Sequence, residues 1–205
     1  MANMYTMQDP TTQFPRPPFP PQQQGAPGTV HEMDPAPDHG EQSYVGTGRL
    51  PGRRALVTGA DSGIGRAVAI AYAREGADVA LSYLPAEQKQ AEEVAALIEK
   101  EGRKALLLPG DLQDEQTNVD VVAKTVEELG GIDILVINAG AMPTVDSIDD
   151  FETHTLDHVM KANIYPLFWL TKAASPHLPA GAAVITTSSE QGFQPSPSLA
   201  EYAVS

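Results

Sequence analysis

The chain has 205 residues, and its 41% hydrophobic content is enough for the core of one ordinary domain. Its 13 basic residues against 27 acidic ones give a net charge of −14, which disfavours binding to nucleic acid or to an anionic membrane surface. The absence of cysteine excludes disulfides, thiolate metal sites and cysteine nucleophiles. No signal-peptide run opens the sequence, and no segment approaches the roughly 20 apolar residues of a membrane span. We therefore expect a soluble, cytoplasmic protein.

Residues 1–50 differ in composition from the rest of the chain. Nine of the 18 prolines lie within the first 40 residues, and a glutamine run follows at 22–24. Because proline lacks an N–H and has a fixed φ, this composition predicts an extended or disordered tail. Pro15, Pro18 and Pro21 also have the PxxP spacing of ligands for proline-binding domains, which is an alternative.

From residue 51 to 205 the pattern is that of a single folded domain. Short apolar runs predict strands at 54–58, 78–83, 104–108, 132–137 and 182–187. Helical periodicity predicts four helices. The first ends near residue 74, and the others span residues 85 to about 101, about 114 to 129 and about 151 to 177. Apolar strands separated by helices indicate a parallel sheet covered on both faces. We predict a doubly wound, Rossmann-type α/β fold.

The segment Thr58-Gly-Ala-Asp-Ser-Gly-Ile-Gly65 lies between the first predicted strand and its helix. Glycine permits a tight turn and a close approach of the backbone to a ligand. The N-terminus of the following helix would direct free N–H groups at a diphosphate. An ordinary strand-to-helix turn is the alternative interpretation.

The G-x3-G-x-G spacing of this turn resembles the short-chain dehydrogenase/reductase (SDR) superfamily. Further landmarks match in order: Asp111-Leu112 after the third strand, Asn138-Ala-Gly140 after the fourth, Asn163 in the long helix, and Ser189 with Tyr202. The tail and the GADVALSYLPAE segment are similar to a bacterial branch of tailed SDRs that are described as general-stress or uncharacterised oxidoreductases. The resemblance implies nucleotide contacts at Gly59, Asp61, Ser62, Gly63, Ile64, Gly65, Tyr83, Asp111, Leu112, Asn138, Ala139 and Gly140.

Hydride transfer between nicotinamide and an alcohol or carbonyl carbon needs a matching proton transfer at oxygen. A tyrosine hydroxyl can carry that proton if a nearby positive charge lowers its ordinary pKa near 10. The resemblance assigns this role to Tyr202, with Ser189 orienting the carbonyl and Asn163 holding a water of the proton relay. Each of these residues alone is more typical of packing or helix capping. No metal is expected.

The chain also departs from the family pattern. Ile137 replaces the first asparagine of the family's NNAG motif, and Pro166 should kink the long helix beside Asn163. Ser205 is one residue before the position of the family's catalytic lysine. We therefore expect a fragment of a longer reading frame, with little or no turnover by itself. A dinucleotide-binding sensor or assembly module without catalysis is the alternative function.

The choice between NAD and NADP depends on the residues after the second strand and in the glycine turn. An acid after the second strand would bind the ribose 2′-OH of NAD, and a basic residue there or in the turn would bind the 2′-phosphate of NADP. Tyr83 occupies the acid position and Ser62 the turn position, so neither place holds a basic residue, and Asp61 adds negative charge. These residues favour NAD. The substrate is expected to be a small alcohol or carbonyl compound.

Two features of the long helix remain. His154 and His158 are one turn apart, which suits either a metal pair or, more simply, a solvated helix face. The helix also has an apolar face, which the family resemblance associates with a subunit interface, so a homo-oligomer, a tetramer or a dimer, is expected. The tail could lie across a neighbouring subunit. The apolar face comprises Val159, Ala162, Leu167, Leu170 and Ala174, with Phe168 and Trp169 beside it.

Overall fold

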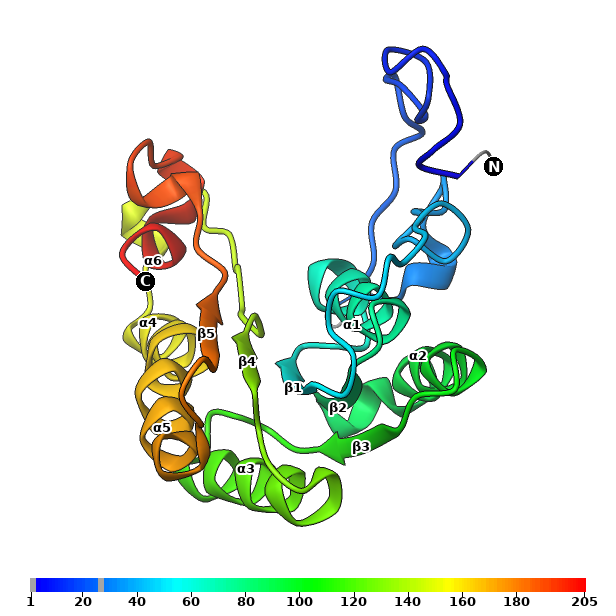
Figure 1. Cartoon of the computed structure of the whole chain (residues 1–205). Coiled ribbons are helices and arrows are strands. Elements are labelled where there is room, and N and C mark those ends of the chain that lie inside the picture. The colour runs from blue at the N-terminus through cyan, green and yellow to red at the C-terminus, as the bar shows by residue number, and fades with distance from the viewer. Residues whose placement is uncertain (1–2, 26–27) are drawn as a thin grey trace.

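A computed structural model of the chain describes residues 3–25 and 28–205 (Figure 1). Residues 1–2 and 26–27 of the predicted tail lie outside the described residues. Five parallel strands form one sheet in the order β3-β2-β1-β4-β5. The strands are β1 (Arg54–Thr58), β2 (Asp78–Tyr83), β3 (Ala105–Pro109), β4 (Ile134–Ile137) and β5 (Ala183–Thr186). This topology confirms the predicted doubly wound α/β fold.

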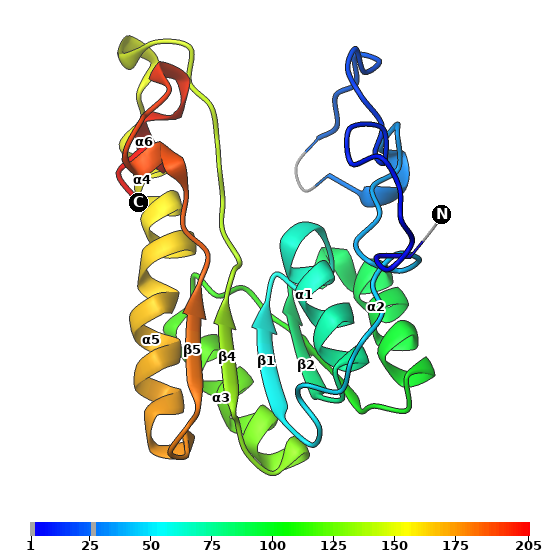
Figure 2. The ribbon, with the colours of Figure 1, turned by 45° about the horizontal axis from the view of Figure 1, so that its top comes forward.

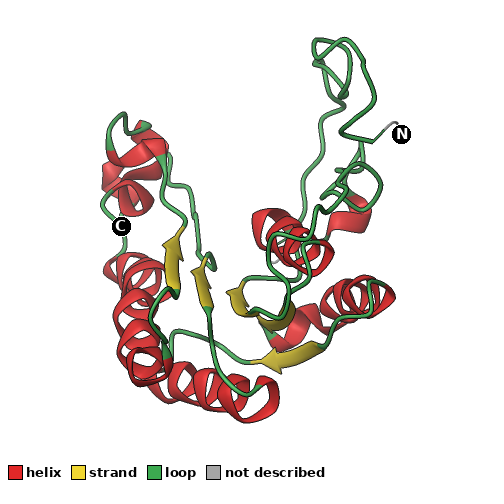
Figure 3. Ribbon diagram, in the orientation of Figure 1, coloured by secondary structure: helices red, strands yellow, loops and turns green. Residues whose placement is uncertain are grey.

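Helices cover both faces of the sheet, as Figure 3 shows. The helices that connect the strands are α1 (Gly63–Arg74), α2 (Gln88–Lys100), α3 (Glu115–Leu129), α4 (Thr153–Val159) and α5 (Tyr165–Ala174), and a short α6 (Ala200–Ala203) lies near the end of the chain. Helices α1, α2 and α3 lie where the periodicity predicted helices, with bounds that differ by a few residues, whereas α6 was not predicted.

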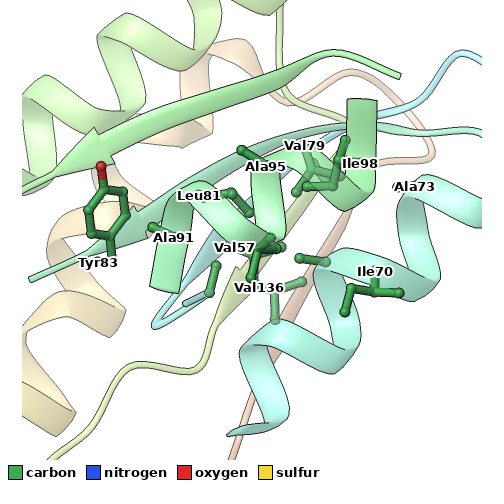
Figure 4. Close-up of a cluster of buried hydrophobic side chains, with 14 of the residues drawn as sticks. Val57, Ile70, Ala73, Val79, Leu81, Tyr83, Ala91, Ala95, Ile98 and Val136 are labelled. Atoms are coloured by element: carbon green, nitrogen blue, oxygen red, sulfur yellow. The ribbon is translucent and has the colours of Figure 1, made fainter. Parts of the chain in front are cut away.

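The core consists of two clusters, one on each face of the sheet. Alternate residues of β1 supply both, because successive side chains of a strand point to opposite faces. Ala55 and Val57 pack with α1 and α2, in the cluster of Figure 4. Leu56 packs on the other face with residues of α3 and α5. The buried strands therefore pack against a helix layer on each face of the sheet.

The long helix predicted near residues 151–177 is interrupted. A π-helical turn, Met160–Ile164, separates α4 from α5, and a 3-10 turn, Ser175–His177, follows α5. Pro166 lies in the first turn of α5 and cannot donate the N–H that a continuous α-helix needs. The irregularity expected beside Asn163 is therefore present as a π-helical turn.

Strand β5 differs from the sequence expectation of a sheet covered on both faces. All four of its residues are exposed, including Val184 and Ile185. The strand lies at the end of the sheet order and pairs only with β4 among the described strands. Apolar composition predicted the strand correctly but did not predict this exposure.

The tail leaves the sheet beside α1 and α2 (Figure 1). It contains one 3-10 turn, Val30–Glu32, and is otherwise irregular over the described residues. Its last part is held by side chains of α1, which the sequence did not predict. Over residues 3–25 and 28–205, no helix is both long and apolar enough to span a membrane.

Candidate functional site

A cleft of about 960 Å³ lies at the carboxyl ends of the strands. In Figure 2 the strands point toward the same edge, with α6 beyond it on one side and the tail on the other. Ligands of doubly wound folds bind at this edge, where the strand order reverses between β1 and β4. Most of the predicted site residues line the cleft: Gly59, Asp61, Ser62, Gly63, Ile64, Tyr83, Asp111, Leu112, Asn138, Ala139, Gly140 and Tyr202.

The glycine turn forms a closely packed wall of this cleft. A Cβ on Gly65 would lie 2.0 Å from the Gly59 carbonyl oxygen and 2.8 Å from Nδ2 of Asn138, so no larger residue fits there. Ser62, the N-cap of α1, makes no side-chain hydrogen bond to the helix. Gly63 has open space where its Cβ would be. The first turn of α1 thus offers N–H groups and room for an anionic group.

Asp61 is a buried carboxylate beside the cleft. It is only 1% exposed, and its Oδ2 has no hydrogen-bond partner within the described structure. Burial raises the pKa of the Asp61 carboxyl, although a hydrogen bond from Ser62 opposes the shift. Buried polar atoms in folded proteins are nearly always paired, so an unpaired carboxylate oxygen is unusual. Because Oδ2 has no donor within the described structure, it can accept a hydrogen bond from a ligand hydroxyl.

A second carboxylate faces the same part of the cleft. Glu87 follows β2, and its Oε2 accepts the Leu84 N–H at 3.2 Å. Burial raises the pKa of Glu87, and the negative charge of Asp61 adds to this rise. Tyr83 packs in the core with its hydroxyl donating to Oε1 of Gln88 at 2.6 Å, so its hydroxyl is already engaged.

Asn138 braces three strand ends. Its N–H donates to Thr58 Oγ1 at 2.9 Å, and its Nδ2 donates to the Thr58 carbonyl at 3.2 Å. Its Oδ1 accepts from the Thr187 hydroxyl at 2.9 Å. These bonds join the ends of β1, β4 and β5 and set the floor of the cleft.

Tyr202 lines the opposite wall of the cleft from α6, and Asn163 lies behind it. Nδ2 of Asn163 donates to the Ala141 carbonyl at 3.0 Å and to Ser205 Oγ at 2.9 Å. The Ser205 hydroxyl in turn donates to the Tyr202 carbonyl at 2.8 Å. Both amide hydrogens of Asn163 are therefore used to hold the loop at Ala141 and the turn that carries Tyr202.

Ser189 is placed differently from Tyr202. It is half-buried and caps a 3-10 turn, accepting the Gln191 N–H at 3.3 Å. It is not among the residues that line the cleft, and neither are Gly65 and Asn163. The structure thus brings Tyr202 and Asn163 together through Ser205, whereas Ser189 stands outside the lining.

Several cleft residues were missed by the sequence reasoning. His158, considered as half of a metal pair, lines the cleft and shares a hydrogen bond with Gln113 Oε1 at 2.8 Å. His154 instead pairs with Glu152 at 2.9 Å on an exposed surface. Gln113 also bonds both oxygens of Asp111. The position of Gln113 just after the Asp111-Leu112 motif is a signal that could have suggested it; Glu87 and His158 have no comparable motif.

These observations define a doubly wound Rossmann-type protein with an anion-accepting glycine turn and a polar cleft at its switch point. The chain belongs to the short-chain dehydrogenase family, an oxidoreductase family: the model described as "short chain dehydrogenase" matches residues 53–205. The resemblance in the sequence motifs is thereby confirmed.

Relatives and solved structures agree with this assignment. The uncharacterized oxidoreductase YhxD of Bacillus subtilis (strain 168) is 56% identical over 185 residues, which cover 90% of this chain and 62% of the relative. The uncharacterized oxidoreductase YghA of Escherichia coli (strain K12) is 52% identical over 200 residues, 98% of this chain and 68% of the relative. A short-chain dehydrogenase from Burkholderia cenocepacia J2315, solved in complex with NADP, has a TM-score of 0.73 at 36% identity, over 76% of this chain and 63% of that chain. The chain thus spans about two thirds of the length of these relatives.

Proposed function

We propose that residues 51–205 bind a nicotinamide dinucleotide in the cleft and take part in oxidoreduction of a small alcohol or carbonyl substrate. The main support is that the glycine turn, through Gly59 and residues 61–64, and Tyr202 line one cleft. The bound nicotinamide would supply or accept the hydride.

The glycine turn fits the diphosphate of such a nucleotide. Gly65 has no room for a Cβ, and the first turn of α1 presents N–H groups that the Ser62 side chain does not cap, with the positive end of the helix dipole. The unpaired Oδ2 of Asp61 fits a ribose hydroxyl, because it is an acceptor without a donor.

The chain's own part in the chemistry is proton transfer. Tyr202 would give a proton to the substrate oxygen during reduction and take it back during oxidation. Asn163, with both amide hydrogens engaged, would act by fixing the turn of Tyr202, and a relay water would bind a carbonyl of the π-helical turn. Ser189 would have to turn toward the cleft to orient a carbonyl oxygen, because its Oγ now caps a turn.

The cleft favours NAD over NADP. Asp61, Glu87 and Asp111 place three carboxylates in its lining, and none of the described lining residues is a lysine or arginine. A 2′-phosphate would meet repulsion there without a basic partner. The NADP complex of the Burkholderia cenocepacia relative belongs to that protein, so affinity has to be measured for this chain.

Titration of the chain with NADH and NADPH, followed by fluorescence, tests the binding proposal. We expect NADH to bind more tightly; tighter binding of NADPH would reverse the assignment. Turnover is tested with a panel of alcohols and aldehydes on a longer polypeptide that includes the remaining third of the relatives' length. There, Tyr202→Phe should lower kcat about 100-fold or more. Binding without turnover in that polypeptide would instead support a non-catalytic nucleotide-binding module.

We extend the proposal to self-association. On α5, Leu170 and Ala174 are buried against the chain's own core, but Phe168 is 65% exposed. A homo-oligomer, a dimer or a tetramer, would cover this ring. Sedimentation analysis of the longer polypeptide tests the idea, and a monomer at all concentrations would exclude it.

A further inference from the structure

The tail segment 38–49, called the strap below, lies along helix α1. Near the end of that helix, the Arg74 guanidinium donates to three strap carbonyls: Gly40 at 2.5 Å, Glu41 at 2.9 Å, and Tyr44. A Cβ on Gly46 would lie 1.9 Å from the Arg74 carbonyl oxygen, so the strap passes directly against the helix backbone. The strap is therefore a packed part of the fold.

The strap has a second attachment near the glycine turn. Oε1 of Glu41 accepts from Nε of Arg66 at 2.8 Å, and Nη1 of Arg66 lies 3.6 Å from Oε2 of Glu93 on α2. The Arg66 side chain is only 9% exposed. This buried guanidinium lies between two carboxylates, although its Nη1 makes no hydrogen bond within the described structure, and it does not line the cleft. Its position suits a structural role instead.

Arg66 also closes the first turn of α1. Its backbone N–H donates to the Ser62 carbonyl at 3.0 Å. The ion pair of the Arg66 side chain can therefore influence the position of the first turn of α1, which belongs to the glycine turn. Glu41 is the strap residue that reaches this side chain.

The first turn of α1 is a wall shared by two cavities. Ser62, Gly63 and Ile64 line the cleft on one side. The same three residues line a second cavity, of about 750 Å³, whose other wall is formed by tail residues such as Thr29 and Pro37. The same three residues therefore separate the cleft from the cavity that the tail lines.

We propose that the strap positions the glycine turn for nucleotide binding, with Glu41 acting through Arg66. The inference rests on the proposed function for its ligand. Glu41 is a positioning residue, because it touches neither the cleft nor the glycine cradle. By reciprocity, a nucleotide in the cleft stabilises the docked strap.

The decisive variant is Glu41→Ala. It removes the contacts of the Glu41 carboxylate with Arg66 and with His39 of the strap but keeps the Glu41 carbonyl that Arg74 holds, so the strap keeps that attachment. We expect the Kd for NADH to rise about fivefold or more. Glu41→Gln keeps an acceptor for the Arg66 N–H and should restore most of the affinity.

Arg49→Gln is the matched control. Arg49 also belongs to the strap, but its side chain pairs with Glu75 at the far end of α1, at 2.8 Å. This variant should lower the melting temperature with little change in the Kd for NADH. Equal effects of Glu41→Ala and Arg49→Gln on that Kd, or no effect of Glu41→Ala, would overturn the proposal.

Hydrogen exchange separates this inference from the proposed function. In the chain without nucleotide, Glu41→Ala should speed exchange in peptides covering residues 59–67, and Arg49→Gln should not. If wild-type chain fails to bind NADH, the proposed function fails, and this exchange result alone decides the inference. Unchanged exchange at 59–67 in the Glu41→Ala variant would refute the positioning role.

Discussion

The two ends of helix α1 have opposite characters. At its C-terminal end Glu75 is 3% exposed, and its carboxylate accepts from Tyr44, Thr47 and Arg49, including two backbone N–H groups. At the N-terminal end Asp61 is equally buried, but its Oδ2 has no partner in the described structure. The pKa values of the two carboxyls are shifted in opposite directions. Hydrogen bonds from Arg49 lower the pKa of Glu75, whereas burial raises the pKa of Asp61.

The difference indicates which end serves stability and which serves binding. A fully paired buried carboxylate stabilises the fold, whereas an unpaired one costs free energy until a ligand supplies a donor. Helix α1 therefore has a fully hydrogen-bonded carboxylate at its C-terminal end and a carboxylate with an unpaired oxygen at its N-terminal end. Substitutions at the two ends should have distinguishable effects on stability and on binding.

The largest effect is expected for Gly65→Ala at the cleft end. The new methyl group would overlap the Gly59 carbonyl oxygen, so the turn must open and the cradle is lost. We expect a stability loss of about 3 kcal/mol, at the upper end for overpacking, and no measurable NADH binding.

Gly102→Ala provides the comparison for Gly65→Ala. Gly102 has a positive φ of 71° but nothing within 4 Å of the added Cβ. It should lose about 1 kcal/mol from backbone strain and bind NADH normally. Wild-type affinity in Gly65→Ala, measured by fluorescence titration, would show that the turn is not the diphosphate site.

Glu75→Gln tests the structural end. Glutamine keeps the shape, but it removes the charge that receives the Arg49 guanidinium and the Tyr44 hydroxyl. We expect the melting temperature to fall by several degrees, with the NADH affinity within about twofold of wild type. A large loss of affinity at unchanged melting temperature would contradict the division between the two ends.

The sequence predicted most of the fold, because the information for it is local. The bounds of β1 and β2 follow from apolar runs of Arg54–Thr58 and Asp78–Tyr83 that charged residues and glycine delimit. Pro166 predicted an irregular helix, although it could not specify a π-helical turn.

The contacts of the strap could not be predicted in the same way. Glu41 and Arg66 are separated by 25 positions, and Thr47 and Glu75 by 28, so their pairing depends on the tertiary path of the tail. Composition in this region shows only a proline-rich segment. Within the candidate site, the sequence selected 12 of the 23 residues that line the cleft, but the position of Ser189 outside the lining depends on a turn that the motif spacing does not encode. The catalytic roles of Asn163, Ser189 and Tyr202 stay predictions.

Asp61→Asn should have a smaller effect, and of opposite sign to Glu75→Gln. It removes a buried charge that lacks a full set of partners, so the chain without ligand should gain up to about 1 kcal/mol. The same change should weaken NADH binding about fivefold, because the ribose loses a charged acceptor. Urea unfolding and fluorescence titration measure the two quantities. A loss of both stability and affinity would place Asp61 among the structural carboxylates.

The smallest effects are expected in the pH dependence of stability, where the two carboxylates should again differ in sign. Glu75 has a pKa below its ordinary 4.5, so its stabilising contribution is complete above 4.5 and is lost as the pH falls through its folded-state pKa. Asp61 has a pKa above its ordinary 3.8, so its charge destabilises the fold at neutral pH, and this cost is relieved as the pH falls toward 3.8. Melting temperatures measured from pH 7 downward should therefore show both variants approaching wild type, Asp61→Asn from above and Glu75→Gln from below. Since the Asp61 pKa is raised and the Glu75 pKa is lowered, Asp61→Asn should converge first, at the higher pH. Convergence in the reverse order would contradict the assignment, because it would mean that Glu75 has the raised pKa and Asp61 the lowered one.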